Sequence, residues 1–536
     1  MMNGSIIVNN IKLPIDASHK EAFSVAKARL STIGVSSKDK TFTVYRRSID
    51  ARNKENIFFV WSVSVSGDFG KLDKSRLLSK DMSFCEDSAF PEIVYGETRL
   101  SAPPVVVGSG PAGLFAALLL AERGYAPILI ERGGSVKERQ GAVEAFNTKH
   151  VLDENTNIQF GAGGAGTFSD GKLVTRVNDP LTSYVLSRFT EFGAPEEIKY
   201  IAKPHVGTDI LSVVVERILD RIESLGGKVL YHTRFISANF RSDTAVSVNT
   251  DRGEIPCGAV ILAIGHSARD TYEGLITSGY QIEAKNFSVG MRIEHLAEDI
   301  DRSMYGKFAG DERLGHAEYN LSYDTKNRGV YTFCMCPGGQ VVAAASESLG
   351  VVVNGMSYHA RDGRNSNSAV VSTVFKEDYG NSPSLAIEFQ RKIERGAFKA
   401  GGGDYRAPII TVGDFLEGKL SSEPCRILPS YMDGKNCTLA SPDEYLPNFV
   451  TSSIRNALSA FDKKIHGFAC PDAVLTGAET RTSAPVRILR DPETRLAVGK
   501  SNFYPAGEGA GYAGGITSAA IDGLKTAISL MTKFKM

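Results

Sequence analysis

The sequence predicts an α/β protein with a doubly wound main body, and three observations lead to that prediction. Residues from 105 to about 285 alternate apolar, strand-like segments with helical ones. Residues 104–131 contain, in order, a strand, a glycine-rich turn, a helix, a second strand and a glutamate. Residues 472–536 return to a strand, a glycine-rich turn and a helix. We therefore expect a large domain that the C-terminal segment completes.

Length and composition bound the class of protein. The 536 residues, 42% of them hydrophobic, suffice for two or three domains with their own cores. Lys plus Arg and Asp plus Glu both number 61, and this balance argues against an electrostatic nucleic-acid binder. The seven scattered cysteines form no small disulfide framework and favour a reducing compartment. The chain begins without a signal-peptide pattern, so we expect a soluble, cytoplasmic protein with no membrane span.

The segment 104–131 carries the fingerprint of a Rossmann-type, dinucleotide-binding domain. Gly108 permits a tight turn, Gly110 lets a pyrophosphate approach the backbone, and Gly113 lets the helix pack on the strand. The helix N-terminus offers free N–H groups to phosphates. Glu131 ends the second strand, where its carboxylate can accept hydrogen bonds from ribose hydroxyls. An acid there repels a 2′-phosphate, so the ligand is FAD or NAD rather than NADP.

Three further glycine clusters favour FAD over NAD. They lie at residues 161–172, 251–270 and 503–517, far from the first one. A short NAD site does not need them. A flavin is longer, and its ribityl chain and ring need a second acid at a strand end and a second helix N-terminus. We therefore predict FAD as the cofactor.

Several long motifs link the chain to a known group of proteins. They are RRSIDAR at 46–52, GGAGTFSDGKL at 163–173, PHVGTD at 204–209, GAETRTSAPVRI at 477–488 and YPAGEGAGYAGGI at 504–516. With them the chain resembles FAD enzymes of the glutathione-reductase-2 type. Within that group it resembles a family of largely uncharacterised bacterial FAD-dependent dehydrogenases, described as NAD(FAD)-utilising. The resemblance covers essentially the whole chain and is specific for fold and FAD, but it does not define a substrate.

The resemblance implies cofactor roles for particular residues. Glu508 would bind the ribityl and pyrophosphate region, where an Asp is more usual, and Phe235 would offer its backbone to adenine. Arg139 and Lys172 would be pyrophosphate neighbours or, alternatively, surface residues. Residues of the second glycine cluster would pass close to the flavin and phosphates, namely Gly163, Gly164 and Thr167. Other residues assigned to the cofactor are Pro111, Ala112, Arg132, Ala263, Gly265 and Gly507.

The start of the last predicted helix has a separate role in this resemblance. Gly515, Ile516 and Thr517 would begin that helix, whose dipole would stabilise negative charge at the pyrimidine edge of a reduced flavin.

The candidates for substrate chemistry begin with two cysteines. The segment 331–343 resembles the strand and turn that border the flavin in reductases of the geranylgeranyl type. On a regular strand Cys334 and Cys336 would face the same side with Cα atoms about 7 Å apart, at the limit of disulfide geometry. They are either a redox pair or one packed cysteine and one that lines the site, and we take Cys336 as a catalytic candidate. Without two further ligands they make a poor zinc site, and we predict no metal.

Three other positions are catalytic or substrate-binding candidates. Arg481 precedes the C-terminal glycine cluster and is a candidate anion anchor near the flavin. His205 is a proton donor or a structural histidine, and the same two alternatives hold for His266. The polar loop 354–368 either lines the substrate pocket or is a surface loop.

We divide the chain into four segments. They are a small N-terminal α/β module at 1–98, the first part of the FAD-binding domain at 103–285, an inserted mixed α+β substrate domain at 286–471, and the C-terminal part of the FAD-binding domain at 472–536. The charged stretch 46–52 of the module is a solvated hairpin or a contact with the main body or a partner.

Together these features predict an FAD-dependent oxidoreductase, a dehydrogenase or reductase that transfers hydride through flavin N5 to or from a small molecule. The alternatives are a flavin monooxygenase of the hydroxybenzoate type and a non-catalytic FAD-binding scaffold. Because the chain has no second complete strand–GxGxxG–helix unit, NADH or NADPH would bind only transiently as electron donor. We expect no nucleic-acid partner, and the sequence leaves the oligomeric state open.

Overall fold

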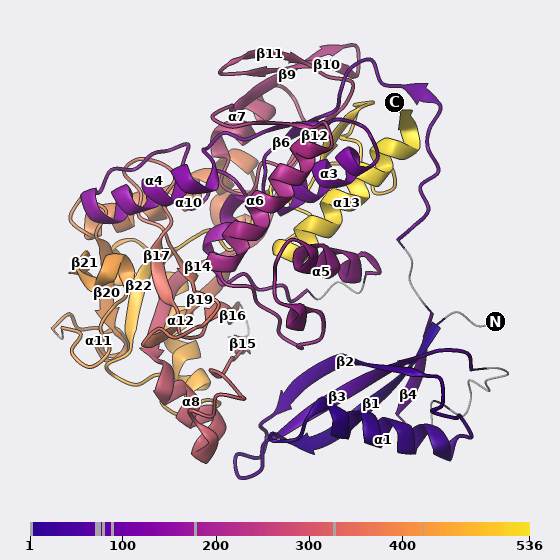
Figure 1. Cartoon of the computed structure of the whole chain (residues 1–536). Helices are drawn as coiled ribbons and strands as arrows, with labels where there is room; N and C mark the ends of the chain where they lie inside the picture. The colour runs from indigo at the N-terminus through magenta and orange to yellow at the C-terminus, as the bar shows by residue number, and fades with distance from the viewer. Residues whose placement is uncertain are drawn as a thin grey trace.

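The computed structural model describes residues 4–69, 77, 81–86, 90–175, 179–324, 328–421 and 423–536. Figure 1 shows a small N-terminal module, drawn in indigo, beneath a larger body in which the C-terminal helix lies beside early segments of the chain. The body has two parts, a parallel sheet covered on both faces and a larger, mainly antiparallel sheet. The structure is therefore of mixed helix and strand, as predicted.

The N-terminal module is a four-stranded antiparallel sheet with one helix. The strand order is β2-β3-β1-β4. The elements are β1 (Gly4–Pro14), α1 (His19–Thr32), β2 (Thr41–Asp50), β3 (Phe58–Ser66) and β4 (Met82–Glu86). Buried positions alternate along β3, and α1 buries Ala22, Ala26 and Leu30. The sheet thus has one face for the helix. Residues 1–3, 70–76, 78–80 and 87–89 of the predicted module lie outside the described residues.

The edge strand β2 of this module pairs with the main body. The backbone N–H of Arg47 donates to the carbonyl of Tyr200 at 2.8 Å, and the N–H of Ala202 donates to the carbonyl of Arg47 at 2.9 Å. Arg52 instead forms an ion pair with Asp50 inside the module, at 2.7 Å. The charged stretch 46–52 therefore contributes one contact with the body and one local, exposed pair.

The parallel sheet has five strands in the order β24-β12-β6-β7-β8, but it is not doubly wound as we predicted, because a small antiparallel sheet covers one of its faces. These strands are β6 (Val105–Val107), β7 (Ile128–Ile130), β8 (Lys228–Leu230), β12 (Val260–Leu262) and β24 (Phe503–Pro505). Val106 and Ile261 pack with the helices on one face, whereas Val107 and Leu262 pack with a second sheet on the other. Burial on both faces explains why the strands are continuously apolar.

Helices cover one face of the parallel sheet and a small antiparallel sheet covers the other. The covering helices are α3 (Pro111–Glu122), α5 (Leu181–Glu191), α6 (Thr208–Ser224) and α13 (Ile516–Lys533). The small sheet has the strands β9 (Phe235–Arg241), β10 (Thr244–Thr250) and β11 (Gly253–Pro256), and α7 (Arg269–Thr277) packs with it. Helices α3 and α13 lie very close together, since a Cβ at Gly523 would be 2.0 Å from the carbonyl oxygen of Ala112.

The second part of the body is built on a seven-stranded sheet of order β15-β16-β19-β14-β22-β20-β21. Its strands are β14 (Phe287–Leu296), β15 (Ser322–Asp324), β16 (Gly329–Cys336), β19 (Asn365–Val374), β20 (Ala407–Thr411), β21 (Cys437–Leu439) and β22 (Val474–Glu479). The main helices around it are α8 (Ala297–Tyr305), α10 (Pro383–Ala400), α11 (Val412–Glu417) and α12 (Asn448–Asp462). A two-stranded ribbon, β17 (Gln340–Ala343) and β18 (Val353–Met356), completes it.

Two boundaries of the sequence-based division differ in the structure. Strand β22, which we assigned to the C-terminal segment 472–536, pairs with β14 and β20 in the second sheet. A short apolar strand does not reveal which of two sheets it joins, and this caused the error. Strand β5 (Thr98–Arg99), at the end of the predicted module, pairs instead with β25 (Phe534–Lys535) at the C-terminus. Residues 90–99 therefore run along the main body.

The chain enters and leaves the second part of the body through two adjacent strands. These are β13 (Ile282–Ala284) and β23 (Val486–Ile488), which pair antiparallel. Neighbouring entry and exit strands are the arrangement expected for a domain inserted into another one. Among the described residues, no helix combines the length and apolarity needed to cross a membrane.

Candidate functional site

A cavity of about 1210 Å³ lies between the parallel sheet and the second part of the body. Its lining includes the residues that follow β6 and β12, together with residues of β16 and β18 from the inserted domain. Pockets for a single small ligand usually measure about 300–1,000 Å³. This cavity therefore has room for a ligand larger than most, or for two ligands side by side.

One end of the cavity is the glycine-rich turn between β6 and α3. Gly108 has a φ of +93°, and a Cβ at Gly113 would be 1.8 Å from the carbonyl oxygen of Gly108. Gly110 has no atom closer than 3.9 Å to its Cβ position and faces the cavity. The turn therefore has the tight conformation and the open backbone that a pyrophosphate site requires.

A second glycine loop closes over this turn. A Cβ at Gly164, where φ is +63°, would be 2.8 Å from the Cα of Gly110. The two loops come from segments 54 residues apart and leave no room for a side chain at Gly164. Such a cradle, open to the cavity along both backbones, fits a dinucleotide.

Glu131 lines the cavity, but protein donors already surround its carboxylate. Oε2 accepts from the N–H and the hydroxyl of Ser109, at 2.9 and 2.7 Å. Oε1 accepts from the N–H groups of Gly133 and Gly161, at 3.1 and 3.0 Å. A ribose hydroxyl would have to share these acceptor positions, and the rotatable Ser109 hydroxyl is the donor most easily displaced. The sequence did not reveal this role of Glu131 in joining the two loops.

Arg139 is not a surface residue and does not line the cavity. It is fully buried, and its guanidinium donates to backbone carbonyls at 2.5–3.1 Å. Those carbonyls belong to Asn157, Ile158, Ala162 and Gly164. Arg139 thus fixes the shape of the second glycine loop from behind, and the predicted surface alternative is wrong.

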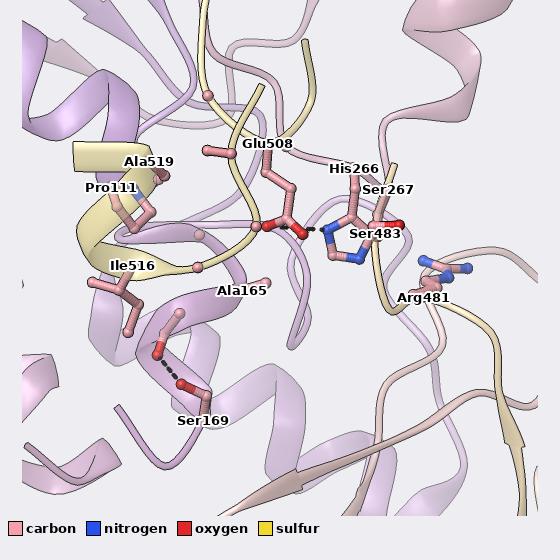
Figure 2. A pocket seen from close by; sticks show the side chains of 18 of the residues that line it. Pro111, Ala165, Ser169, His266, Ser267, Arg481, Ser483, Glu508, Ile516 and Ala519 are labelled. Carbon is pink, nitrogen blue, oxygen red and sulfur yellow. Dashed lines mark hydrogen bonds and ion pairs between the residues drawn. The ribbon is translucent and has the colours of Figure 1, made fainter. Parts of the chain in front are cut away.

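The N-terminus of α13 lies in the wall of the cavity. Gly515 and Ile516 line it, and Figure 2 shows Ile516 and Ala519 of α13 close to Pro111 of α3. Thr517 is turned away, because its hydroxyl donates to the carbonyl of Leu173 at 2.8 Å. This helix of 18 residues therefore directs the positive end of its dipole into the cavity.

Glu508 and His266 face each other in the cavity wall, as Figure 2 shows. Burial raises the pKa of Glu508 to about 7, a rise that the charge of Lys285 only partly opposes. Burial, aided by the charges of Arg481 and Arg269, lowers the pKa of His266 to about 3. His266 is therefore neutral at pH 7, and the pair is not a salt bridge between two full charges.

Arg481 also lines the cavity, but a buried carboxylate compensates its charge. Its Nε and Nη2 donate to Glu394 at 3.3 and 3.1 Å. Glu394 at the same time accepts from Arg269 at 2.7 and 2.8 Å. As an anion anchor, Arg481 would therefore act through its remaining N–H groups, with most of its charge balanced.

Cys334 and Cys336 do not lie on a regular strand. A β-bulge lies between Phe333 and Cys336, and Cys334 within it has a φ of +43°. Cys334 is exposed and Cys336 is 1% exposed, while both thiols are free. Burial raises the pKa of Cys336 to about 11. Both cysteines line the cavity, and the less exposed of the two is our catalytic candidate Cys336.

A buried arginine holds the bulge in place. Arg292 of β14 is fully buried and donates to the carbonyl of Cys334 at 2.5 Å and to Glu479 at 3.2 Å. It also contacts the Sγ of Cys336 at 3.8 Å and Asn367 at 2.8 Å. The cavity wall at the cysteines therefore depends on an ion pair that no sequence motif revealed.

His205 does not line the cavity. Its Nε2 lies 3.1 Å from the carbonyl of His359, and the two rings are stacked with centroids 5.3 Å apart. Burial, with the positive charge of Arg361, lowers the pKa of His205 to about 4. The geometry supports the structural alternative for this histidine, and the predicted role as a proton donor lacks the necessary access.

Most of the predicted cofactor residues line the cavity. They are Gly108, Gly110, Pro111, Ala112, Glu131, Arg132, Gly164, Lys172, Phe235, Ala263, Gly265, Gly507, Glu508, Gly515 and Ile516. Those that support the lining without being part of it are Gly113, Arg139, Gly163, Thr167 and Thr517. Of the polar loop 354–368, Asn354 and Gly355 line the cavity.

Several lining residues were not predicted from the sequence. Lys203 immediately precedes the motif PHVGTD and Asp170 lies inside GGAGTFSDGKL, so proximity to a motif could have identified both. Lys285 and Glu318 also line the cavity, but only the tertiary structure brings them there.

Comparison with known proteins identifies the family. The family model described as "FAD-dependent protein, C-terminal domain-like" matches residues 286–482, and a domain of unknown function matches residues 5–66. An uncharacterized protein of Clostridium beijerinckii is 45% identical over 537 residues, which are 99% of each chain. The chain belongs to a family of FAD-dependent proteins. The predicted FAD cofactor agrees with this family.

Several solved structures are also similar to the chain. Glycine oxidase from Bacillus cereus is 11% identical, with 81% of this chain and 98% of that one covered and a TM-score of 0.36. L-proline dehydrogenase from P. horikoshii is 12% identical, with coverages of 80% and 92% and a TM-score of 0.31. CtdE in complex with FAD is 12% identical, with coverages of 80% and 84% and a TM-score of 0.32.

Proposed function

We propose that this FAD-dependent protein is an oxidoreductase that transfers hydride to or from a small molecule. The observation that supports this most directly is the shape of the cavity. One end is a glycine cradle suited to a dinucleotide, and the other end is lined by the inserted domain. A volume of about 1210 Å³ allows a second, smaller molecule to lie beside the cofactor.

The residues of the two glycine loops would hold the cofactor. Gly110 and Gly164 offer open backbone to the pyrophosphate, and Glu131 fixes both loops while accepting a ribose hydroxyl in exchange for Ser109. Phe235 lines the cavity at the start of β9, where the adenine would lie. Bound FAD supplies the hydride-transfer chemistry, and the protein supplies orientation and electrostatics.

Two features of the chain would favour the reduced state. The N-terminus of α13 directs positive potential toward the middle of the cavity, where it stabilises developing negative charge. Glu508 has a raised pKa of about 7 and His266 a lowered one of about 3, so at neutral pH Glu508 is only about half ionised and the wall carries less negative charge than an ordinary glutamate would give. Both features act before any substrate binds, which is the preorganisation that catalysis needs.

The electron donor would reach the cavity from solvent. The parallel sheet uses its glycine-rich turn for one dinucleotide, and we propose that NADH or NADPH binds only transiently beside it. The substrate would be a small molecule that is held between the cofactor and β16 of the inserted domain.

The test is spectroscopic. The purified chain should show the flavin spectrum, with FAD released on denaturation, and NADH or NADPH should bleach it without oxygen. Bleaching that restores fully with air and yields no oxygenated product supports a dehydrogenase or reductase. Oxygen uptake coupled to hydroxylation would indicate the monooxygenase instead. If no donor and no mild chemical reductant can reduce the bound FAD, only the non-catalytic FAD-binding scaffold would remain. A protein that cannot take up FAD would refute the proposal.

A further inference from the structure

Five charged side chains form a cluster at the end of the cavity next to the inserted domain. They are Asp170, Lys172, Lys203, Glu318 and Arg361. The Nζ of Lys172 lies 2.9 Å from Asp170 and 3.6 Å from Glu318, and the Nζ of Lys203 lies 3.8 Å from Glu318. All of them except Arg361 line the cavity.

Arg361 already neutralises much of the negative charge from behind. Its Nε and Nη2 donate to Asp170 at 3.1 and 2.7 Å, and its Nη1 donates to Glu318 at 2.6 Å. Burial opposes ionisation of both carboxyls, but the charges of Lys172 and Arg361 outweigh it and lower the pKa of Asp170 and of Glu318. Both carboxylates are therefore ionised at neutral pH.

The cluster as a whole carries one positive charge that no carboxylate of the cluster balances. Three cations face two carboxylates, and His205 beside them is neutral because its pKa is lowered to about 4. The side chain of Arg361 is 12% exposed, whereas those of Lys172 and Lys203 are 27% and 56% exposed. The excess charge is therefore presented to the cavity by the two lysines.

The position of Lys172 places this charge near the reacting end of the cavity. The adjacent residue Leu173 accepts the hydrogen bond from Thr517 at the start of α13. The charge of Lys172 also acts on the thiols of Cys334 and Cys336. Lys172 thus lies between the helix N-terminus and the inserted domain, where a substrate would lie, and not only beside the pyrophosphate, as predicted from the sequence.

We propose that Lys172 and Lys203 bind a carboxylate group, so that the substrate is a small carboxylic acid. This inference rests on the proposed oxidoreductase function. Tyr331 and Phe333 also line the cavity and would contact an apolar or aromatic body. A single excess charge suits a monoanion, and lysine ammonium groups can reorient to meet it. A phosphate dianion would leave its second charge unpaired in this wall.

The first experiment compares probes of one shape and different charge. Benzoate, benzamide, benzylamine and phenyl phosphate are titrated into the FAD-loaded protein, with calorimetry for affinity and the flavin difference spectrum for location. Benzoate should bind and perturb the flavin spectrum, benzamide should bind at least about tenfold more weakly, and benzylamine should not bind. Equal affinity for benzamide and benzoate, or tighter binding of phenyl phosphate, would overturn the inference.

The second experiment assigns the charge to the two lysines. Lys172→Gln and Lys203→Gln should each weaken benzoate at least about fivefold and leave benzamide unchanged. Lys199→Gln is the matched control, because Lys199 lies near Lys203 in the chain, pairs with Glu196 at 2.8 Å and does not line the cavity. Should Lys172→Gln fail to fold, the more exposed Lys203→Gln gives the same test. Unchanged benzoate affinity in Lys203→Gln would refute the assignment.

The two proposals fail in different ways. A protein that binds FAD and is reduced by a donor, yet shows no preference for benzoate, would refute the substrate class alone. A protein that cannot take up FAD would refute the proposed function, and flavin uptake is therefore measured before any probe is added.

Discussion

Glu508 and His266 stand 3.8 Å apart, measured from the carboxylate Oε2 to the imidazole Nδ1. Glu508 follows β24 and His266 follows β12, so two adjacent parallel strands bring together residues 242 positions apart in the chain. The Nε2 of His266 is buried and has no hydrogen-bond partner among the described residues. The contact between these two strand ends is therefore not a salt bridge between two full charges at neutral pH, and Glu508 lies next to the cavity.

The raised pKa of Glu508 predicts a pH-dependent stability. The pKa of Glu508 is about 7 in the folded protein, whereas an ordinary glutamate has a pKa of 4.5. Ionisation of this carboxyl therefore lowers the stability of the folded protein as the pH rises from 4.5 to about 7. The Glu508→Gln variant lacks this ionisation, so its stability relative to the unchanged protein should increase from pH 5 to pH 8. In the flavin-free proteins the difference in melting temperature should grow by about 2 °C or more. Glu493→Gln, at an exposed position, is the control and should show no such trend. A constant difference between Glu508→Gln and the unchanged protein would contradict the prediction.

The close approach of the two glycine loops predicts the effect of a single methyl group. Gly164→Ala places a Cβ 2.8 Å from the Cα of Gly110 and should weaken FAD binding at least about tenfold, since the loops must separate. Gly124→Ala is matched to it, because Gly124 has a φ of +81° and no atom within 4 Å of its Cβ position. It should cost about 1 kcal/mol of stability and leave FAD affinity unchanged. Equal FAD affinity in both variants, by fluorescence titration, would refute the role of the cradle.

The sequence predicted well those parts of the site that are local in the chain. The turn, the helix and the acid of residues 104–131 occur in the order that the fingerprint requires, and Gly113 has the close contact expected of it. The predicted strand, turn and helix of the C-terminal segment are β24 and α13. Here the pattern of apolar residues and glycines determines the backbone directly.

What the sequence could not show depends on long-range partners. The carboxylate of Glu131 is held by Gly161, and the guanidinium of Arg292 by Glu479, 187 residues away. The regular strand that we expected at Cys334 contains a bulge, because buried Arg292 binds the carbonyl of Cys334. Neither periodicity nor composition records such contacts.

A shared buried carboxylate predicts a large loss of stability. Glu394 is 2% exposed and accepts from both Arg269 and Arg481. Glu394→Gln would leave two buried guanidinium groups with less compensation and should cost about 3–5 kcal/mol in urea unfolding at pH 7. Glu388→Gln, on the same helix but with a side chain 54% exposed, should cost less than about 1 kcal/mol. Similar costs for the two variants would show that the buried network contributes little.

The same carboxylate has a defined pH dependence. Burial opposes ionisation of Glu394, but the charges of Arg269 and Arg481 outweigh it and lower its pKa below the ordinary 4.5. Its stabilising contribution is therefore complete above pH 4.5 and is lost as pH falls below that value. The stability difference between the unchanged protein and Glu394→Gln should shrink below pH 4.5, and a difference that grows on acidification would contradict this.

Strand β2 of the N-terminal module pairs with the main body, so we expect amides at this junction to be protected from hydrogen exchange. The N–H of Arg47 donates to the carbonyl of Tyr200, and the N–H of Ala202 donates back to Arg47. Ala202→Pro removes the second donor and should raise hydrogen exchange at residues 45–49, with β1 unchanged. Ala194→Ser, at a buried position of the same domain without this pairing, is the control and should leave exchange at 45–49 unaltered. Unaltered exchange in Ala202→Pro would show that the pairing is weak.

The two cavity cysteines should differ from each other in their reactivity. Thiolate is the reactive form, and burial raises the pKa of Cys336 to about 11. At pH 8 we therefore expect iodoacetamide to modify the exposed Cys425 and the exposed Cys334 before Cys336, which is also only 1% exposed. Peptide mass spectrometry measures the order and, under air, the absence of a Cys334–Cys336 disulfide. Rapid modification of Cys336, or a disulfide that donors reduce, would instead establish the redox pair as part of the reaction.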